Sequence, residues 1–276
     1  MHPLLTDILK HKDKEIRALY HTVEQQPQSP LAQIVHGVSP VPAATGEKFY
    51  QTVQQASFAV IAEYKRQSPT QQQQQTTPSL EDQLLQYCQH HATAISLITE
   101  ASHFNGSLAD ATIAIPLAQS YQTPVLRKDF ILDDIQIAES LLAGFAAVLL
   151  VVSITGTHTR ELFKTALAYG IDALVEVHTL SELHFALEFG ARIIAINNRH
   201  LHTFTVDPDH AFALKPHIPQ DILTIAASGI DTPEQAQRLR AAGFTGILVG
   251  TVLMQSAQPG KLIDQFRGYS DAHHSD

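Results

Sequence analysis

The feature of this sequence that most constrains its fold is an eightfold alternation of short apolar segments with longer amphipathic ones. The apolar segments lie at 58–62, 94–98, 124–126, 147–152, 173–175, 193–196, 222–226 and 247–249. A uniformly apolar segment of this length is typical of a strand that is covered on both faces, as in a parallel sheet. Eight such strands alternating with helices predict an α/β protein built as a single (β/α)8 TIM barrel.

Several of the intervening stretches have helical periodicity, at 134–143, 159–169, 180–189 and 232–242. Each is followed by a glycine just before the next strand, namely Gly144, Gly170, Gly190 and Gly243. Glycine readily adopts the left-handed conformation that closes many helices. An open, doubly wound sheet is the alternative fold. It would be expected to carry a glycine-rich turn after its first strand, and residues 65–70 contain no glycine.

The regions outside this alternation predict an extension and a tail. Residues 4–20 have apolar positions at helical spacing, with lysines such as Lys12 between them, and predict an amphipathic helix. Residues 25–46 are rich in Pro, Gln and Ser and predict a connecting segment, and 47–55 a second short helix. We therefore expect an N-terminal helical extension packed on the barrel (1–48), the (β/α)8 barrel (49–268) and a polar tail (269–276).

Composition argues against two classes of partner. The 276 residues are 44% hydrophobic and 16% charged, which suits a large core, and the net charge is −9. This charge argues against a nucleic-acid partner or an anionic membrane. It does not argue against a phosphorylated small molecule, because backbone amides and a few cations can hold one phosphate.

The sequence also predicts a cytoplasmic protein. Residues 1–15 lack the apolar core of a signal peptide, and no apolar run approaches the length of a membrane span. The single cysteine, Cys88, permits no intrachain disulfide, which favours a reducing compartment. Cys88 lies in a helical stretch, where we expect it to be a packed apolar residue.

Charged and polar residues recur where the predicted strands end. Glu63 and Lys65 are two residues apart, so both side chains point to the same side of their strand. Lys128, Glu176 and Asn197 follow later strands. Because function in this fold lies at the carboxyl ends of the strands, we expect these five side chains to converge on one acid–base site.

Three further pairs of residues near the strand ends have expected roles of their own. Arg127 and Asp129 stand on either side of Lys128, so they point away from the barrel interior and predict a structural ion pair. Ser228-Gly229 and Gly250-Thr251 follow the last two strands. They match the position of the phosphate-binding corner of such barrels, which is made of backbone amides.

These residues, with their neighbours, resemble the indole-3-glycerol phosphate synthase family. The matching segments are 61–69, 94–100, 104–107, 124–130, 174–178, 196–201, 227–230 and 248–250. They cover nearly the whole chain, and the helix before the barrel matches as well.

The resemblance implies a carboxy-lyase of tryptophan biosynthesis, which converts 1-(2-carboxyphenylamino)-1-deoxyribulose 5-phosphate to indole-3-glycerol phosphate, CO2 and water. By similarity, Lys128 would be the acid for ring closure. Lys65 would be its electrostatic partner or the acid of the dehydration. Glu176 would be the general base, Glu63 would tune Lys65, and Asn197 would bind polar groups of the substrate.

The resemblance also implies the contacts of the substrate. Arg199 would face the anthranilate carboxylate, which suits a guanidinium fork, and Ser228 would bind substrate. The apolar slot for the benzene ring would be formed by Phe104, Phe130, Pro69, Leu201 and Ile230. The phosphate would be held by Lys65, Ser68, Gly229, Gly250 and Thr251. No cofactor is implied.

Histidines near the expected mouth raise the question of a metal. His178, His200 and His202 lack the spacing that frames a metal site, and the resemblance implies no metal, so none is expected. The position of Cys88 away from a strand end disfavours the related phosphoribosylanthranilate isomerase.

Two departures from the family pattern keep an alternative open. Ala227 stands where the family usually has a glutamate, and the first strand-to-helix loop runs into a glutamine tract at 71–75 instead of a Ser-x-Gly turn. The tract cannot build a packed core, and closure of the site could suffer. The alternative is a diverged barrel, non-catalytic or of altered function, that binds a phosphorylated ligand.

Overall fold

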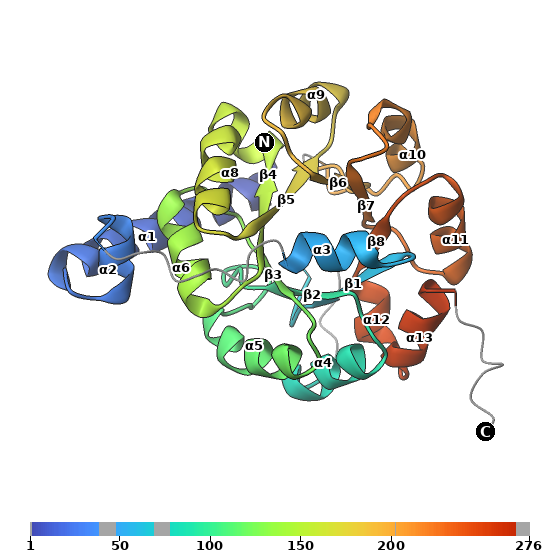
Figure 1. Cartoon of the computed structure of the whole chain (residues 1–276), viewed down its shortest axis with the longest axis horizontal. Helices are drawn as coiled ribbons and strands as arrows, with labels where there is room; N and C mark the ends of the chain where they lie inside the picture. The colour runs from blue at the N-terminus through green and yellow to red at the C-terminus, as the bar shows by residue number, and fades with distance from the viewer. Residues whose placement is uncertain (1, 39–47, 69–77, 202, 269–276) are drawn as a thin grey trace.

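Eight parallel strands form a closed barrel in the computed structural model, which describes residues 2–38, 48–68, 78–201 and 203–268 (Figure 1). The strands are β1 (Ala59–Tyr64), β2 (Ala94–Ile98), β3 (Val125–Lys128), β4 (Ala147–Val151), β5 (Asp172–Val177), β6 (Ile193–Asn197), β7 (Leu223–Ala227) and β8 (Gly246–Val249). They are hydrogen-bonded in chain order, and β8 pairs with β1. The predicted (β/α)8 barrel is confirmed, and the open sheet is excluded.

Helices surround the barrel in Figure 1. They are α4 (Leu80–Gln89), α5 (Ala111–Ser120), α6 (Asp134–Ala143), α7 (Val152–Thr155), α8 (Thr159–Ala168), α9 (Leu180–Glu188), α10 (His210–Leu214), α11 (Pro233–Ala241), α12 (Thr251–Gln255) and α13 (Pro259–Phe266), with 3-10 turns η1 (Leu108–Asp110), η2 (Gly156–His158) and η3 (Lys215–His217). The four helices predicted from periodicity are confirmed within one residue at each end. The glycines after them, Gly144, Gly170, Gly190 and Gly243, all have positive φ, from 67° to 89°.

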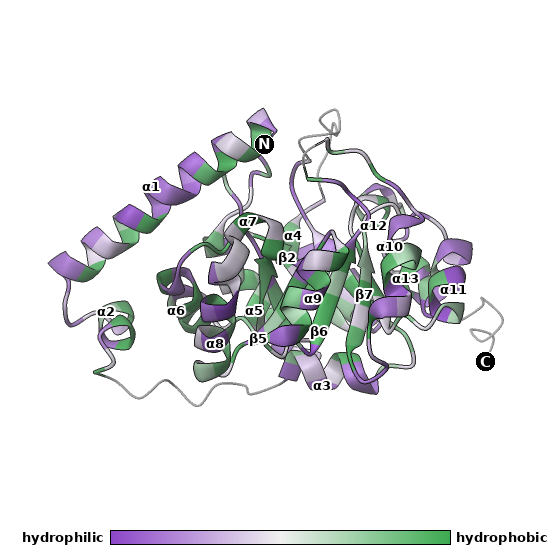
Figure 2. Ribbon diagram, turned by 90° about the horizontal axis from the view of Figure 1, so that it is seen from above, coloured by the Kyte–Doolittle hydropathy of each residue, from purple (hydrophilic) through white to green (hydrophobic). Residues whose placement is uncertain are grey.

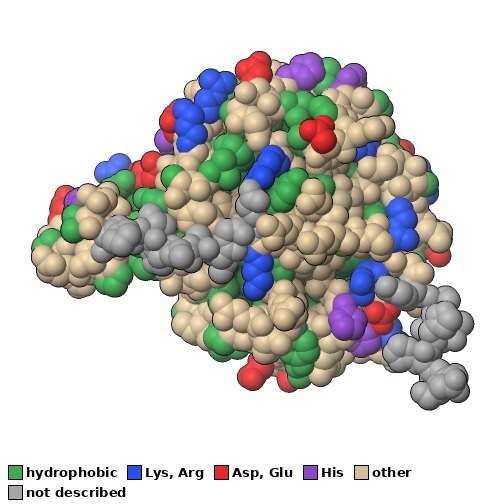
Figure 3. Space-filling view, viewed as in Figure 1, with side chains coloured by type: hydrophobic (Ala, Val, Ile, Leu, Met, Phe, Trp, Pro, Cys, Tyr) green, Lys and Arg blue, Asp and Glu red, His purple; other side chains and the backbone are tan. Residues whose placement is uncertain are grey.

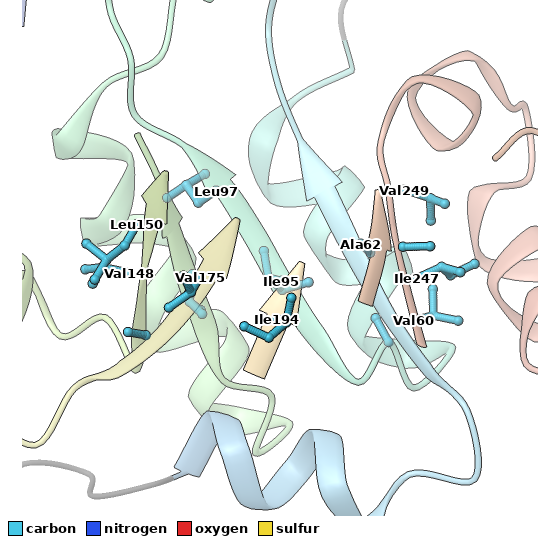
Figure 4. Packing of buried hydrophobic residues seen from close by; sticks show 14 of the residues in the cluster. Val60, Ala62, Ile95, Leu97, Val148, Leu150, Val175, Ile194, Ile247 and Val249 are labelled. Carbon is cyan, nitrogen blue, oxygen red and sulfur yellow. The ribbon is translucent and has the colours of Figure 1, made fainter. Parts of the chain in front are cut away.

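The strands have two buried faces because alternate side chains point inward and outward. Figure 4 shows Val60, Ile95, Val148 and Ile247 on the outer side, between the strands and the helices, as part of one large apolar cluster. The inward residues, such as Ile61, form a second cluster inside the barrel. The sequence therefore reads as continuously apolar, as parallel strands covered on both faces require.

Helix α3 (Lys48–Gln55) closes the amino-terminal end of the barrel. Phe49 and Val53 are fully buried against inward residues of the strands, and the backbone N–H of Tyr50 donates to Asp172 Oδ2 at 2.8 Å. Figure 1 shows α3 crossing this end, and in the space-filling view of the same face, Figure 3, charged side chains of both signs are scattered. The short helix predicted before the first strand is confirmed, and the opposite end of the barrel remains available for a site.

The predicted N-terminal helix is longer than its apolar pattern indicated. Helix α1 spans Pro3–Gln25, and Figure 2 shows its amino-terminal end on the side of the barrel opposite α3. The expectation that 25–46 is only a connecting segment was wrong, because α2 (Pro30–Val35) lies within it. Ser29 caps α2, accepting from the backbone N–H of Ala32, and a proline at the first turn suits a helix start.

Lys12, expected on the polar face of α1, is buried instead, with 1% of its side chain exposed. It lies four residues after Ile8, so it belongs to the helix face that packs on the barrel. Its Nζ is 2.8 Å from Asp129 Oδ1, at the end of β3, and 2.7 Å from Glu15 Oε2. Burial raises the pKa of Asp129, but the charges of Arg127 and Lys12 lower it by a larger amount, so the net pKa lies below the ordinary value.

We expect Lys12→Met to lower the free energy of unfolding by about 3 kcal/mol, the lower end of what breaking a buried pair costs, since Asp129 keeps Arg127. The wild-type contribution is complete above about pH 4, the unfolded pKa of aspartate, and is lost as pH falls through the lower folded pKa. Urea unfolding at pH 7 and pH 3 measures both effects. Lys14→Met, at an exposed position of the same helix, is the control. Equal effects of the two substitutions would contradict this account.

Candidate active site

A cavity of about 330 Å³ lies at the carboxyl ends of the strands, within the range of small-molecule sites. Among its lining residues are Glu63, Lys65, Ser68, Phe104, Lys128, Phe130, Glu176, Asn197, Arg199, Leu201, Ser228, Gly229, Ile230, Gly250 and Thr251. The structure thus brings together every candidate site residue that it describes. Pro69 lies outside the described residues, as does the 71–75 tract.

Glu63 bridges the two lysines of the site. Lys65 Nζ donates to Glu63 Oε1 at 3.0 Å and to Thr251 Oγ1 at 2.9 Å. Lys128 Nζ lies 3.8 Å from Glu63 Oε2. Burial raises the pKa of Glu63, but the charges on Lys65, Lys128 and Arg199 outweigh it, so the net pKa lies below the ordinary value. Glu63 is therefore an ionised group that holds two ammonium groups side by side.

Strand periodicity explains why these side chains meet. Glu63 continues the inward positions of β1, and Lys128 is two residues after Leu126, which belongs to the inner cluster of β3. Glu176 follows inward Leu174 in β5 by the same spacing. Inside the barrel, each layer of inward side chains is covered by the next layer along the strands. The last inward position at the carboxyl end has no further layer over it, so a polar side chain there faces the cavity.

Glu176 is held by its neighbours at the far side of the cavity. Asn197 Nδ2 donates to Glu176 Oε1 at 3.0 Å, and Asn197 Oδ1 accepts the backbone N–H of Arg199 at 3.0 Å. His178 Nε2 lies 3.1 Å from the same Oε1. Glu176 is only 3% exposed. The carboxylate is therefore fixed in place beside the cavity.

Arg199 begins a short irregular loop that forms another wall. Its Nη1 donates to the carbonyl of Phe204 at 3.1 Å, and its backbone forms an antiparallel bridge with Val206. Burial lowers the pKa of Arg199 from its ordinary value, with Glu63 opposing the shift. The guanidinium stays charged in any case. It supplies a half-buried cation to the cavity.

Backbone geometry shapes the corner formed after β7 and β8. Ser228 and Gly229 both have left-handed φ, 68° and 69°, a conformation that is uncommon for serine and easy for glycine. A Cβ on Gly250 would collide with the side chain of Glu63, and one on Gly229 with Val206. Glycine is therefore required at both positions, because these side chains approach the backbone too closely for a Cβ. Thr251 lies at the same corner, where its hydroxyl accepts a hydrogen bond from Lys65.

Arg127 and Asp129 form the ion pair expected of them, with 3.2 Å between Arg127 Nη2 and Asp129 Oδ2. Arg127 is buried and also pairs with Glu139 of α6 at 2.9 Å. Asp129 borders the cavity but is engaged by Arg127 and Lys12. The pair fastens β3 to its surroundings on either side of Lys128.

Several lining residues were missed from the sequence. They are Ile8 of α1, Glu100, Phe204, Val206 and Asp231. Glu100 Oε2 accepts the backbone N–H groups of His103 and Phe104, so it shapes the loop that carries Phe104. Glu100 ends a segment that matches the family, and that match could have indicated a place in the site. No sequence pattern indicated Ile8 or the loop residues Phe204, Val206 and Asp231, because only tertiary packing brings them to the cavity.

Ala227 lies in β7 with 4% exposure and lines the cavity. It is in the inner apolar cluster, which also includes Leu149 and Leu248. This part of the wall is apolar where the family pattern has a carboxylate.

Within the described ranges, the side chains offer no metal centre and the helices no membrane span. No three His, Cys, Asp or Glu side chains there gather in a way that could hold a metal ion. His202 is outside those ranges. No described helix is both long and apolar enough to cross a membrane.

The fold and the site define a (β/α)8 barrel whose strand-end cavity is lined by two lysines and two glutamates, Lys65, Lys128, Glu63 and Glu176. The model of the family described as indole-3-glycerol phosphate synthase matches residues 5–266. The chain belongs to the indole-3-glycerol phosphate synthase family.

Curated relatives agree with this family assignment, and solved structures agree with the fold. The chain is 33% identical to the indole-3-glycerol phosphate synthase of Bacteroides thetaiotaomicron, over 96% of this chain and 98% of the relative. It is 37% identical to that of Lacticaseibacillus paracasei, over 88% and 92%. Among solved structures, tryptophan synthase subunit alpha from Legionella pneumophila has a TM-score of 0.59 at 13% identity, covering 82% of this chain and 98% of that one, which supports the fold alone.

Proposed function

We propose that the protein is an indole-3-glycerol phosphate synthase, a decarboxylating lyase of tryptophan biosynthesis. It converts 1-(2-carboxyphenylamino)-1-deoxyribulose 5-phosphate to indole-3-glycerol phosphate, CO2 and water. The observation that carries the proposal is the convergence of Lys65, Lys128 and Glu176 on one cavity. The match of the family model to nearly the whole chain supports it.

The first step joins the anthranilate ring carbon that bears the carboxylate to the ketone carbon of the sugar. Lys128 donates a proton to the ketone oxygen as this bond forms, and loss of CO2 restores the aromatic ring. The placement of Lys128 in the cavity, 3.8 Å from Glu63, supports this role, since the carboxylate of Glu63 holds the ammonium group beside the substrate.

The second step removes water to complete the indole. Lys65 either protonates the departing hydroxyl or supports Lys128 electrostatically, and Glu176 accepts the proton released from the new ring. Glu63 holds both lysines, and Asn197 binds polar groups of the substrate while orienting Glu176. Two acids and a base in one half-buried cavity suffice for both steps.

The remaining lining residues divide between the ends of the substrate. Arg199 pairs with the anthranilate carboxylate before it leaves, and Ser228 binds substrate nearby. The benzene ring lies among Phe104, Phe130, Leu201 and Ile230, with Pro69 assigned by resemblance alone. The phosphate is held by Lys65, Ser68, Gly229, Gly250 and Thr251. The place of Gly229 and Gly250 after β7 and β8 supports this end as the phosphate site.

We also propose that the enzyme works in the cytoplasm without cofactor or metal, and that residues 1–48, 49–268 and 269–276 form its extension, barrel and tail. The burial of Lys12 and Ile8 of α1 against the barrel supports the packing of the extension. Residues 269–276 lie outside the described ranges.

Turnover of the substrate is the direct test. We expect the purified protein to generate the fluorescence of the indole product from the carboxyphenylamino substrate, with inorganic phosphate as a competitive inhibitor. Competition without any turnover would instead support the diverged, ligand-binding barrel. Absence of both would remove the proposed function altogether.

Ala227→Glu is expected to raise kcat/KM by roughly 10- to 100-fold, the effect of one hydrogen bond to a charged group. The substitution places a carboxylate in the apolar stretch of wall between β6 and β8, where it can bind polar groups of the substrate. Steady-state kinetics measures the gain. Ala227→Gln is the matched control, with the same size and no charge. A gain of equal size in the control, or a loss in both, would contradict a role for the missing charge.

A further inference from the structure

His178 is a buried titratable residue with no role in the steps above. It follows Glu176 by two residues at the end of β5, so both side chains are on the inner face of the strand. Its side chain is 8% exposed, and it is not among the residues that line the cavity. Its backbone N–H donates to Glu182 Oε2 at 2.7 Å, at the start of α9. The ring therefore stands behind Glu176 on a fixed backbone.

The hydrogen bonds around Glu176 determine which atom carries each proton. The backbone N–H of Arg199 can only donate, so Asn197 Oδ1 is the acceptor and Asn197 Nδ2 is the donor to Glu176 Oε1. An ionised Glu176 can only accept. His178 Nε2, 3.1 Å from the same oxygen, must then carry a hydrogen.

The other ring nitrogen decides the charge of His178. Within the described chain, Nδ1 is buried and has no hydrogen-bond partner. An imidazolium would leave a charged N–H donor buried without an acceptor, which costs more than a bare neutral acceptor. The neutral ring with hydrogen on Nε2 is the form that fits.

We propose that His178 is a positioning residue for Glu176. Its Nε2–H and Asn197 Nδ2 both donate to Oε1, and in the described chain no hydrogen bond to the carboxylate ends on Oε2. Oε1 is thereby occupied, and Oε2 is the oxygen that accepts the proton from the substrate. This inference rests on the proposed function, because it assigns Glu176 the part of the base.

Other charged groups line the same cavity as Glu176. They are Glu63 and Lys65 from β1, Glu100 after β2, Lys128 and Asp129 at the end of β3, Arg199 after β6 and Asp231 after β7. Within the described part of the chain, none of them hydrogen-bonds to Oε1, whereas His178 does. Substitution of His178 is therefore the selective way to disturb this oxygen.

The experiment compares His178→Leu with His178→Gln, whose side-chain amide can donate from nearly the place of Nε2. We expect His178→Leu to lower kcat about tenfold, the effect of one hydrogen bond to a charged group, with KM within twofold. His178→Gln should restore kcat to within about threefold of wild type, because its amide donates to Oε1 in place of Nε2–H. His184→Leu, at an exposed position of α9, is the control.

A second measurement is independent of activity. Nitrogen NMR of histidine-labelled wild type should show His178 as the neutral Nε2–H tautomer at pH 7, and Glu176→Leu should alter that signal. An Nδ1–H tautomer or an imidazolium overturns the proposal, as does a His178→Gln variant no better than His178→Leu. A wild-type protein without turnover would defeat the proposed function. The tautomer would still show whether His178 Nε2–H donates to Glu176 Oε1.

Discussion

Lys128→Met should lower kcat by about 100- to 10,000-fold, the contribution of general acid catalysis, while KM changes by less than about threefold. Methionine keeps the length of the side chain and lacks the proton that the ketone oxygen receives during ring closure. Lys128 pairs with Glu63 at 3.8 Å and is partly exposed, so its loss leaves Glu63 paired with Lys65 and the barrel folded. Indole fluorescence in single-turnover and steady-state assays measures the loss.

The control for this prediction is Lys164→Met. Lys164 is an exposed lysine of α8, and it pairs with Glu161 on the same helix, away from the cavity. Its substitution should leave kcat and KM unchanged. A kcat of Lys128→Met within tenfold of wild type would show that Lys128 is not the acid for ring closure. Lys65 would then be the candidate for that role.

Glu176→Gln is the second substitution with a large expected effect. The amide matches the carboxylate in shape, and its oxygen can still accept from Asn197 and His178, so the wall of the cavity is preserved. It cannot accept a proton from the substrate. We expect kcat to fall by about 100- to 10,000-fold, the range for loss of a general base. The dissociation constant for the substrate should change by less than about threefold, and equilibrium binding to the inactive variant measures it.

Glu161→Gln, on the surface of α8, is the matched control and should behave as wild type. Loss of substrate binding in Glu176→Gln, in proportion to the loss of rate, would make Glu176 a binding group. Loss of rate alone makes it a group of the chemical step.

The barrel and the strand-end positions could be predicted because they depend on local periodicity. An apolar run with side chains alternating between two buried layers needs no knowledge of its neighbours, and eight such runs leave few closed arrangements. The same period of two places Glu63 with Lys65, and Lys128 on the opposite face from Arg127 and Asp129. These relations are properties of one strand, and the structure bears out the orientation of each pair.

Partners far apart in the chain could not be predicted from local patterns. Lys12 was placed on the polar face of α1, because the helix pattern alone gives no reason to bury a lysine. The reason is the buried carboxylate of Asp129, which is 117 positions away in the sequence. Phe204 and Val206 have no periodic pattern, yet the bridge from Val206 to Arg199 turns them toward the cavity.

Sequence by itself determined the (β/α)8 class, the inward positions at the strand ends and the family. Tertiary structure alone decided which oxygen of Glu176 is held, that Glu63 bridges both lysines, and that α1 closes on the barrel through Lys12. The physical reason is range. The pleat of a strand sets which way a side chain points from neighbouring residues, but a hydrogen bond or buried ion pair forms only where the closed barrel and its extension bring separate elements within about 3 Å.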